Sequence, residues 1–165
     1  MSYVVIRFVE PGRWDWSSRL IAWFTQGKYS HVEFITPHGK ALGARLKGGV
    51  QARDFHYIGN RKSRLFRIEV SDNLLYQYAN SQRGKPYDWL AIVGFIFGRD
   101  WQNQRRWFCS EYVTWAILRS GVELLRVDDV AKITPDDVAL SPYIKRMGAR
   151  EVRDFLREGR AMRFD

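Results

Sequence analysis

A chain of 165 residues suits one domain with a substantial core, and 45% hydrophobic with 15% aromatic residues exclude a disordered chain. The single cysteine, Cys109, excludes an internal disulfide and a cysteine-rich zinc site. The net charge of +9 is spread along the chain, which is typical of a solvated surface and also favours anionic partners such as cell-wall polymer, phospholipid or nucleic acid. We therefore expect one domain spanning residues 1–165.

The first seventy residues predict mainly strands. Tyr3–Val9 has the composition of a strand, and it lacks the basic region and cleavage site of a signal peptide. An apolar face predicts a helix over residues 18–25, which ends at Gly27. The other expected strands cover residues 29–36, 41–46 and 64–70, with a short extended piece from Val50.

Residues 71–165 predict mainly helices. The expected helices run from Ser71 or Asp72 to about Gln82, from Tyr87 to about Phe97, from about Cys109 to the stop at Gly121, from the cap Thr134, and from Ala149 to Met162. Because strands and helices are segregated along the chain, the sequence indicates an α+β domain.

No transmembrane segment is expected, because the longest apolar stretch, Trp89–Phe97, is far too short to span a membrane. Without a signal peptide or a membrane span, we expect a soluble, cytoplasmic protein. A cell-wall substrate would then require export by another route, such as phage lysis or assembly. The sequence leaves the oligomeric state open.

Cys109 falls at the expected start of a helix, where free N–H groups and the helix dipole favour a thiolate. A nucleophilic thiol also needs a base. His38 lies in a turn and His56 is either packed or at the surface, whereas His31 lies inside a strand whose apolar neighbours hold its ring. We therefore predict a Cys109–His31 pair, the alternative being a buried cysteine and a satisfied core histidine. The scattered histidines predict no metal site.

Three segments resemble motifs of the NlpC-type, papain-like cysteine hydrolases: Tyr29–Ile35, Gly84–Trp89 and Phe108–Val113. The histidine segment precedes the cysteine segment, as in the circularly permuted branch that includes the YiiX and YaeF proteins and is related to the lecithin–retinol acyltransferase group. The resemblance covers roughly residues 3–121, with a weaker echo at Thr134–Asp137. It implies a permuted papain-like, NlpC-type α+β fold, in which a small antiparallel sheet packs against helices and the nucleophile lies at a helix N-terminus.

The resemblance also implies the roles of three residues. Cys109 would be the nucleophile, His31 its general base, and Tyr87 a residue that borders the substrate. The sulfur would attack an amide, ester or thioester carbonyl, and N–H groups at the helix start would stabilise the oxyanion. We expect a cysteine peptidase or amidase that needs no cofactor and acts on a peptide, a peptidoglycan fragment or an acyl-lipid.

The residue that orients the histidine in this family would fall about twelve positions after His31. This position is Gly43, which has no side chain. Glu33 lies on the same strand face as His31, because side chains alternate along a strand, and it is our candidate for the orienting role. Gln51 is a second candidate.

Three other functions remain open from the sequence. A lipid acyltransferase would use the same residues, and the glycine at position 43 also suits a catalytically inactive papain-like binding domain. The arginine-rich segment 145–163 could bind nucleic acid. Acidic residues interrupt this segment, and no helix-turn-helix or RNA-binding signature accompanies it, so we expect no specific nucleic-acid binding.

Overall fold

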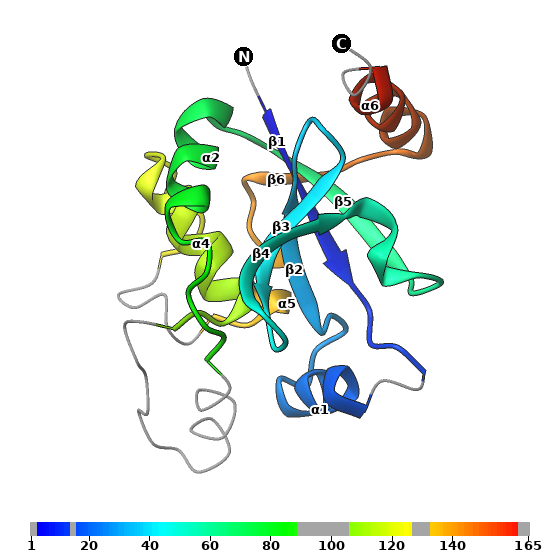
Figure 1. The fold of residues 1–165 in the computed structure, drawn as a ribbon, viewed down its shortest axis with the longest axis vertical. Helices are drawn as coiled ribbons and strands as arrows, with labels where there is room; N and C mark the ends of the chain where they lie inside the picture. Colours follow the sequence, from blue (N-terminus) through cyan, green and yellow to red (C-terminus); the bar gives the residue numbers. More distant parts are fainter. Residues whose placement is uncertain (1–2, 14–15, 89–105, 127–132, 162–165) are drawn as a thin grey trace.

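The computed structural model describes residues 3–13, 16–88, 106–126 and 133–161. Its elements in chain order are β1 (Tyr3–Val9), α1 (Trp16–Phe24), β2 (His31–Ile35), β3 (Lys40–Arg45), β4 (Gly49–Asp54), the 3-10 helix η1 (Phe55–Ile58), β5 (Ser63–Glu69), α2 (Asp72–Ser81), α4 (Cys109–Arg119), α5 (Pro135–Ala139), β6 (Ile144–Arg146) and α6 (Ala149–Ala161). The strands form one six-stranded sheet in the order β4-β3-β2-β1-β5-β6, in which every neighbouring pair is antiparallel (Figure 1). The structure therefore has the expected α+β architecture.

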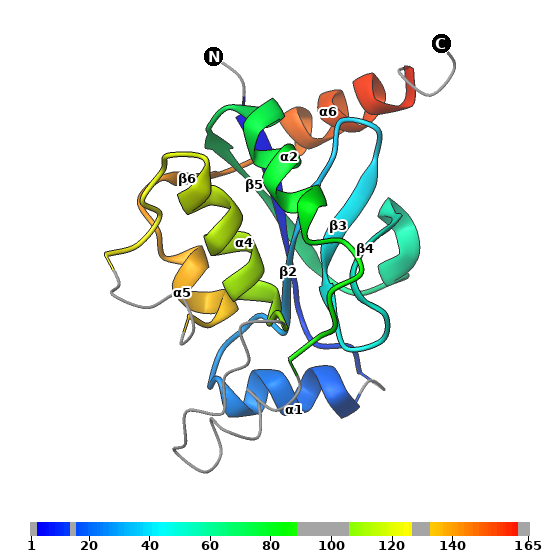
Figure 2. The same cartoon turned by 60° about the vertical axis from the view of Figure 1, so that its left-hand side comes forward.

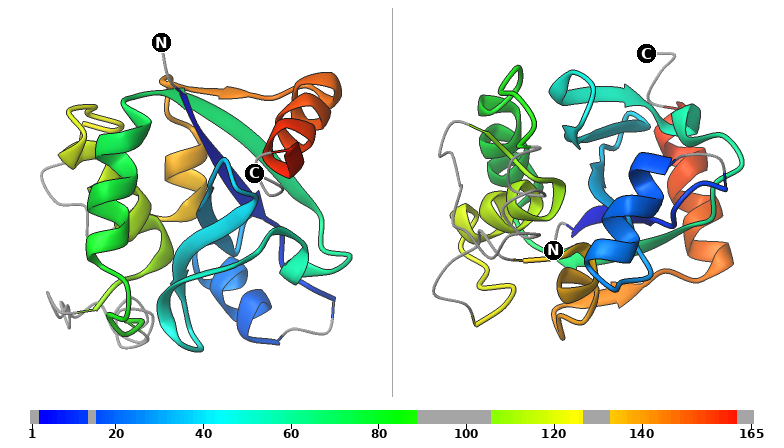
Figure 3. Two further views of the ribbon diagram at one scale, coloured as in Figure 1. Left: turned by 45° about the horizontal axis from the view of Figure 1, so that its top comes forward. Right: turned by 90° about the horizontal axis from the view of Figure 1, so that it is seen from below.

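Helices cover both faces of the sheet. α2, α4 and α5 lie on one face, and α6 lies on the other (Figures 1 and 2). α1 crosses the end of the sheet at which β1 finishes and β2 begins, as the view from below in Figure 3 also shows. Because both faces are covered, β1 and β2 are buried at every residue after their first, instead of alternating between core and solvent.

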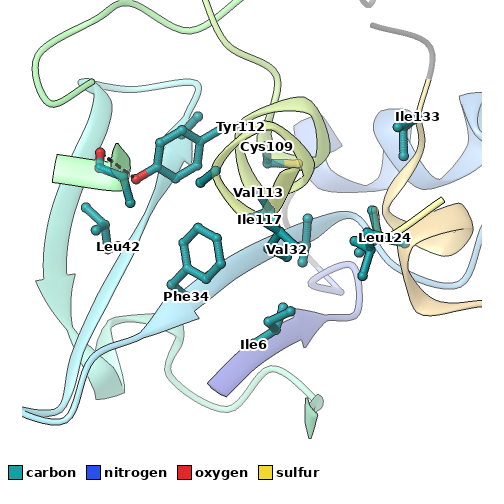
Figure 4. Packing of buried hydrophobic residues seen from close by; sticks show 14 of the residues in the cluster. Ile6, Val32, Phe34, Leu42, Cys109, Tyr112, Val113, Ile117, Leu124 and Ile133 are labelled. Atoms are coloured by element: carbon teal, nitrogen blue, oxygen red, sulfur yellow. Dashed lines mark hydrogen bonds between the residues drawn. The ribbon is translucent and has the colours of Figure 1, made fainter. Parts of the chain in front are cut away.

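The larger core fills the space between the sheet and the helices α2, α4 and α5. Figure 4 shows Tyr112, Val113 and Ile117 of α4 facing Val32 and Phe34 of β2. A smaller cluster lies on the opposite face, where Val152 and Phe155 of α6 pack against buried residues of β1, β2, β3 and β5. The sheet thus separates two apolar layers, and a polar group buried on either face needs partners within the protein.

Most predicted elements are confirmed within two residues. The cap predicted at Thr134 is present, since its Oγ1 accepts a hydrogen bond of 3.1 Å from the backbone N–H of Asp137. η1 and β6 were not predicted, because each has only three or four residues. The helix predicted from Tyr87 is wrong at its start, where Tyr87 forms an isolated parallel bridge with Trp107, and residues 89–97 lie outside the described residues.

Nothing in the described part of the chain resembles a transmembrane helix, since none of its helices combines the necessary length and apolar character.

Candidate active site

Cys109 is the first residue of α4, as the sequence predicted. The backbone N–H of Phe108 donates a hydrogen bond of 3.0 Å to the Glu111 carboxylate, which fixes the first turn of the helix. α4 packs on β2, and the backbone N–H groups of Val32 and Ser110 hydrogen-bond to the Cys109 sulfur. The thiol therefore lies beside the backbone of the residue that follows His31.

The thiol of Cys109 is fully buried, contrary to the exposure that a nucleophile needs. Burial raises the pKa of Cys109 to about 12, and the hydrogen bonds from the Val32 and Ser110 N–H groups offset only part of this effect. The carboxylate of Glu111 raises the pKa further, because it occupies the same positive end of the helix. In this conformation the thiol is protonated at neutral pH, so the thiolate expected from the helix position is not present.

His31 is the first residue of β2, and its ring is bound to Glu33. Nε2 of His31 lies 3.2 Å from Oε2 of Glu33. Since an ionised carboxylate only accepts hydrogen bonds, Nε2 is the ring nitrogen that carries the proton. In the neutral ring Nδ1 then keeps its lone pair and is the nitrogen that can act as a base.

Glu33 is completely buried and receives donors on both of its carboxylate oxygens. Oε1 accepts from Nε and Nη2 of Arg7, at 2.9 and 2.5 Å. Oε2 accepts from Nη2 of Arg45 and, at 3.0 Å, from the Tyr57 hydroxyl, in addition to His31. Arg7 is fully buried and Arg45 nearly so, so the carboxylate and its two guanidinium partners form a desolvated ion cluster.

The ion cluster sets the protonation of both Glu33 and His31. Burial by itself raises the pKa of Glu33, but the hydrogen bond from His31 and the charges of His31, Arg45 and Arg7 outweigh it and lower the pKa to about 2. Burial lowers the pKa of His31 below its ordinary value, against the opposing effect of Glu33. At neutral pH the geometry therefore holds a charged carboxylate against a neutral imidazole.

Gly43 lies opposite Glu33 on the neighbouring strand β3. A Cβ atom at position 43 would approach Cβ of Glu33 to 2.8 Å, which is closer than real Cβ contacts. The space in which the resemblance expects an orienting side chain is therefore occupied by Glu33 itself. The carboxylate that contacts His31 comes from the histidine's own strand, and the glycine on β3 makes room for it.

Gly43→Ala is expected to lower the free energy of unfolding by about 1–3 kcal/mol, because the new methyl group overpacks the buried site around Glu33. Urea unfolding of the wild type and the variant measures this difference. Gly148→Ala is the control, since a Cβ there meets no atom within 4 Å and the loss should stay below about 1 kcal/mol. Equal losses in the free energy of unfolding of the two variants would show that the close contact with Glu33 does not destabilise Gly43→Ala.

Tyr87 lies next to the segment that leads into α4. Its ring packs against that of Phe108 with centroids 5.7 Å apart, and the segment that carries it is paired to Trp107 just before α4. Burial raises the pKa of Tyr87 well above its ordinary value, and the neighbouring Cys109 adds to the effect. Tyr87 and His31 both line a pocket of about 170 Å³, and Cys109 is not among the described residues that line it.

Asp136 fixes the segment that leads into His31. Its carboxylate accepts hydrogen bonds from the backbone N–H groups of Lys28 and Tyr29, at 2.9 and 3.0 Å. Gly27 is required for this contact, because a Cβ atom there would lie 2.0 Å from Oδ2 of Asp136. The segment Thr134–Asp137 therefore anchors the approach to the histidine strand through Asp136.

The structure thus brings together three of the four predicted site residues. His31 is hydrogen-bonded to Glu33, and Tyr87 lines the same pocket as His31. Cys109 adjoins this group, but within the described residues no hydrogen bond joins its sulfur to the His31 ring. Among the hydrogen bonds of the described residues, none joins Gln51, the second candidate for the orienting role, to His31. The side-chain amide of Gln51 instead binds Arg53 and the backbone of Lys47.

Neither a family model nor a curated protein matches the sequence. Among solved structures, the chain is similar to metalloprotein yiiX (DUF1105) from Escherichia coli O157:H7, with a TM-score of 0.65 and 19% identity over 89% of this chain and 96% of that one. In contrast to that protein's description, the described residues here bring together no group of three or more His, Cys, Asp and Glu side chains that could hold a metal ion. At this identity the likeness concerns the fold, and we conclude that the chain has a yiiX-like α+β fold.

Proposed function

We propose that this chain is a cysteine-dependent hydrolase with a permuted papain-like, NlpC-type site, which cleaves an amide, ester or thioester bond through an acyl-enzyme. The observation that carries the proposal is the hydrogen bond from Nε2 of His31 to the buried carboxylate of Glu33, on the strand that packs against Cys109. A carboxylate saturated by two arginines and a tyrosine is a costly arrangement. Its clearest use here is to fix the orientation and tautomer of one histidine.

The proposed reaction begins from a neutral pair, because the thiol is protonated and the imidazole is neutral. As the sulfur of Cys109 attacks the carbonyl carbon, its proton passes to Nδ1 of His31. The imidazolium then gives this proton to the leaving amine, alcohol or thiol, and the acyl group remains on Cys109 as a thioester. Water attacks the thioester with His31 as base, and the acid product and the thiol are released.

The oxyanion of this reaction would form at the start of α4. The N–H groups of Val32 and Ser110 already lie against the sulfur, and N–H groups in the first turn of a helix have no partner within the helix. Such donors are positioned to stabilise negative charge that develops next to the attacking atom. For the thiol to meet a substrate, its side chain has to turn from the core toward the pocket at His31 and Tyr87.

A catalytically inactive binding domain is the second candidate. The observation that favours it is the complete burial of Cys109, whose pKa is raised to about 12. A buried cysteine with these properties behaves as a small apolar residue and does not react. The two functions differ in whether folding makes this thiol more or less reactive than an ordinary one.

Acylation of Cys109 by p-nitrophenyl acetate tests the proposal, with the thioester identified by mass spectrometry and by its release with hydroxylamine. A hydrolase acylates Cys109 faster in the native protein than in the same chain unfolded in urea, where the thiol is an ordinary one. Cys109→Ala is the control for acetylation at other residues. If the native protein is acylated more slowly than the unfolded chain, the result excludes the hydrolase and supports the catalytically inactive binding domain.

A further inference from the structure

The pocket beside His31 and Tyr87 is bordered by four basic side chains: Arg45, Lys47, Arg53 and Arg61. They come from the end of β3, the turn after it, β4 and the loop before β5, so they belong to separate segments that the fold brings together. None of the described residues that line the pocket carries a carboxylate. The lining therefore presents excess positive charge next to the candidate base.

The buried Glu33 does not neutralise this charge. Its carboxylate is fully buried, is not among the groups that line the pocket and is already bound by two cations, Arg7 and Arg45, so this cluster itself carries net positive charge. Arg53 is held by neutral partners, the Oε1 of Gln51 at 3.1 Å and the backbone oxygen of Lys47 at 3.3 Å. A guanidinium bound only by neutral acceptors keeps its full charge for a ligand.

Two of the basic side chains, Arg45 and Arg53, are also held in place. The guanidinium groups of Arg45 and Arg53 lie over the ring of Tyr57, at 4.5 and 5.7 Å from its centroid, and the Tyr57 hydroxyl is bound to Glu33. The same carboxylate therefore orients the histidine and, through Tyr57, supports the basic wall of the pocket. A wall fixed in this way binds an anion with little further ordering of side chains.

We propose that this pocket binds an anionic group of the substrate, a carboxylate or a phosphate, while the carbonyl to be cleaved lies between His31 and Cys109. The inference rests on the proposed function for the position of the carbonyl, but not for the binding of the anion. At about 170 Å³ the pocket is smaller than the ~300 Å³ at which sites for whole drug-sized ligands begin, so it suits one charged group of a larger molecule.

Binding is measured in Cys109→Ala, which cannot form an acyl-enzyme, by NMR titration with glutarate, with inorganic phosphate and with the neutral diamide of glutarate. Both anions should shift the backbone amides of His31, Lys47 and Tyr57 in a saturable manner, and the diamide should not. Lys47→Gln combined with Arg53→Gln should weaken anion binding by about 10-fold or more, as expected for two charges within a few ångströms of the ligand. Lys40→Gln is the matched control, because Lys40 is an exposed lysine at the other end of β3 and does not line the pocket.

Equal affinity of the anions for the double variant and for Lys40→Gln, or equal affinity of glutarate and its diamide, would overturn the proposal. Vesicles of phosphatidylglycerol distinguish a lipid surface from a soluble anion. Vesicle binding that glutarate and phosphate do not compete away would also overturn it. The failure of the hydrolase would be seen separately, as a lack of acylation at Cys109, while anion binding to Cys109→Ala persisted.

Discussion

Glu33→Gln is expected to lower the free energy of unfolding by about 3–5 kcal/mol, the effect of removing one partner from a buried ion pair. The substitution keeps the shape of the side chain but leaves the fully buried Arg7 and the nearly buried Arg45 without a counter-charge. The hydrogen bonds of His31 and Tyr57 would then end on a neutral amide. Urea unfolding followed by circular dichroism measures the loss.

Arg67→Gln is the matched control for this prediction. Arg67 and Glu151 are joined at the same short distance of 2.5 Å, but their side chains are 38% and 35% exposed. An exposed pair contributes below about 1 kcal/mol, because water solvates both charges when the pair is broken. Similar losses in the free energy of unfolding of Glu33→Gln and Arg67→Gln would contradict the prediction, because breaking the buried ion cluster would then cost no more than breaking an exposed ion pair.

Acid unfolding provides a second readout of the same cluster. The pKa of Glu33 falls from 4.5 to about 2 on folding, so its stabilising effect is complete above about pH 4.5 and is lost as the pH falls toward 2. The lowered pKa of His31 acts in the same direction from about pH 6.5 downward, because the unfolded chain binds this proton more readily. Glu33→Gln should therefore flatten the dependence of stability on pH between 4.5 and 2.

The fold could be predicted largely from local patterns. The strand at residues 3–9, the hairpin around the turn before Lys40 and the capped helix after Thr134 carry their own signals, and all three are present. The order of the strands carries no local signal. β5 pairs with β1 across more than fifty residues, and β6 joins the edge from beyond α5, pairings that depend on long-range packing.

The sequence patterns did not predict the ion cluster, although its charged residues stand out within apolar strands. Arg7, Glu33 and Arg45 each interrupt an apolar strand, and a charge at such a position needs a partner. Only the register shows that they meet, since Arg7 lies directly opposite Glu33 in the pairing of β1 with β2. Tyr57 could not be predicted as a partner, because η1 places it and such short helices lack periodicity.

The burial of Cys109 could not be predicted either. The helix position favours a thiolate in any sequence, whereas desolvation depends on the residues that the fold packs around the sulfur. Here β2 covers the thiol, and the carboxylate of Glu111 competes for the same helix end. The proposed hydrolase would consequently work by general-base catalysis from a neutral pair, without a preformed thiolate–imidazolium pair.

His31→Ala is expected to lower kcat/KM for the acylating ester by about 10²- to 10⁴-fold, the usual contribution of a positioned general base. The rate of the wild-type protein should fall in acid only below about pH 6.5, because burial lowers the pKa of His31 and keeps the ring neutral at higher pH. The pH dependence of kcat/KM measures both quantities. His38→Ala and His56→Ala are the matched controls, since both rings are on exposed residues away from the pocket.

The pH below which kcat/KM falls, the acid limb of the profile, also tests the role of Glu33. It distinguishes a carboxylate that orients the His31 ring from one that only stabilises the fold. Because the carboxylate raises the pKa of His31, Glu33→Gln should move the limb to lower pH and also reduce the rate at its plateau, in conditions where the variant remains folded. A loss of stability alone changes the amount of folded protein but not the pKa of the base. An unchanged acid limb in Glu33→Gln would contradict the role proposed for Glu33, because the hydrogen bond between His31 and Glu33 would then have no part in the reaction. A His56→Ala variant as slow as His31→Ala would contradict the role proposed for His31.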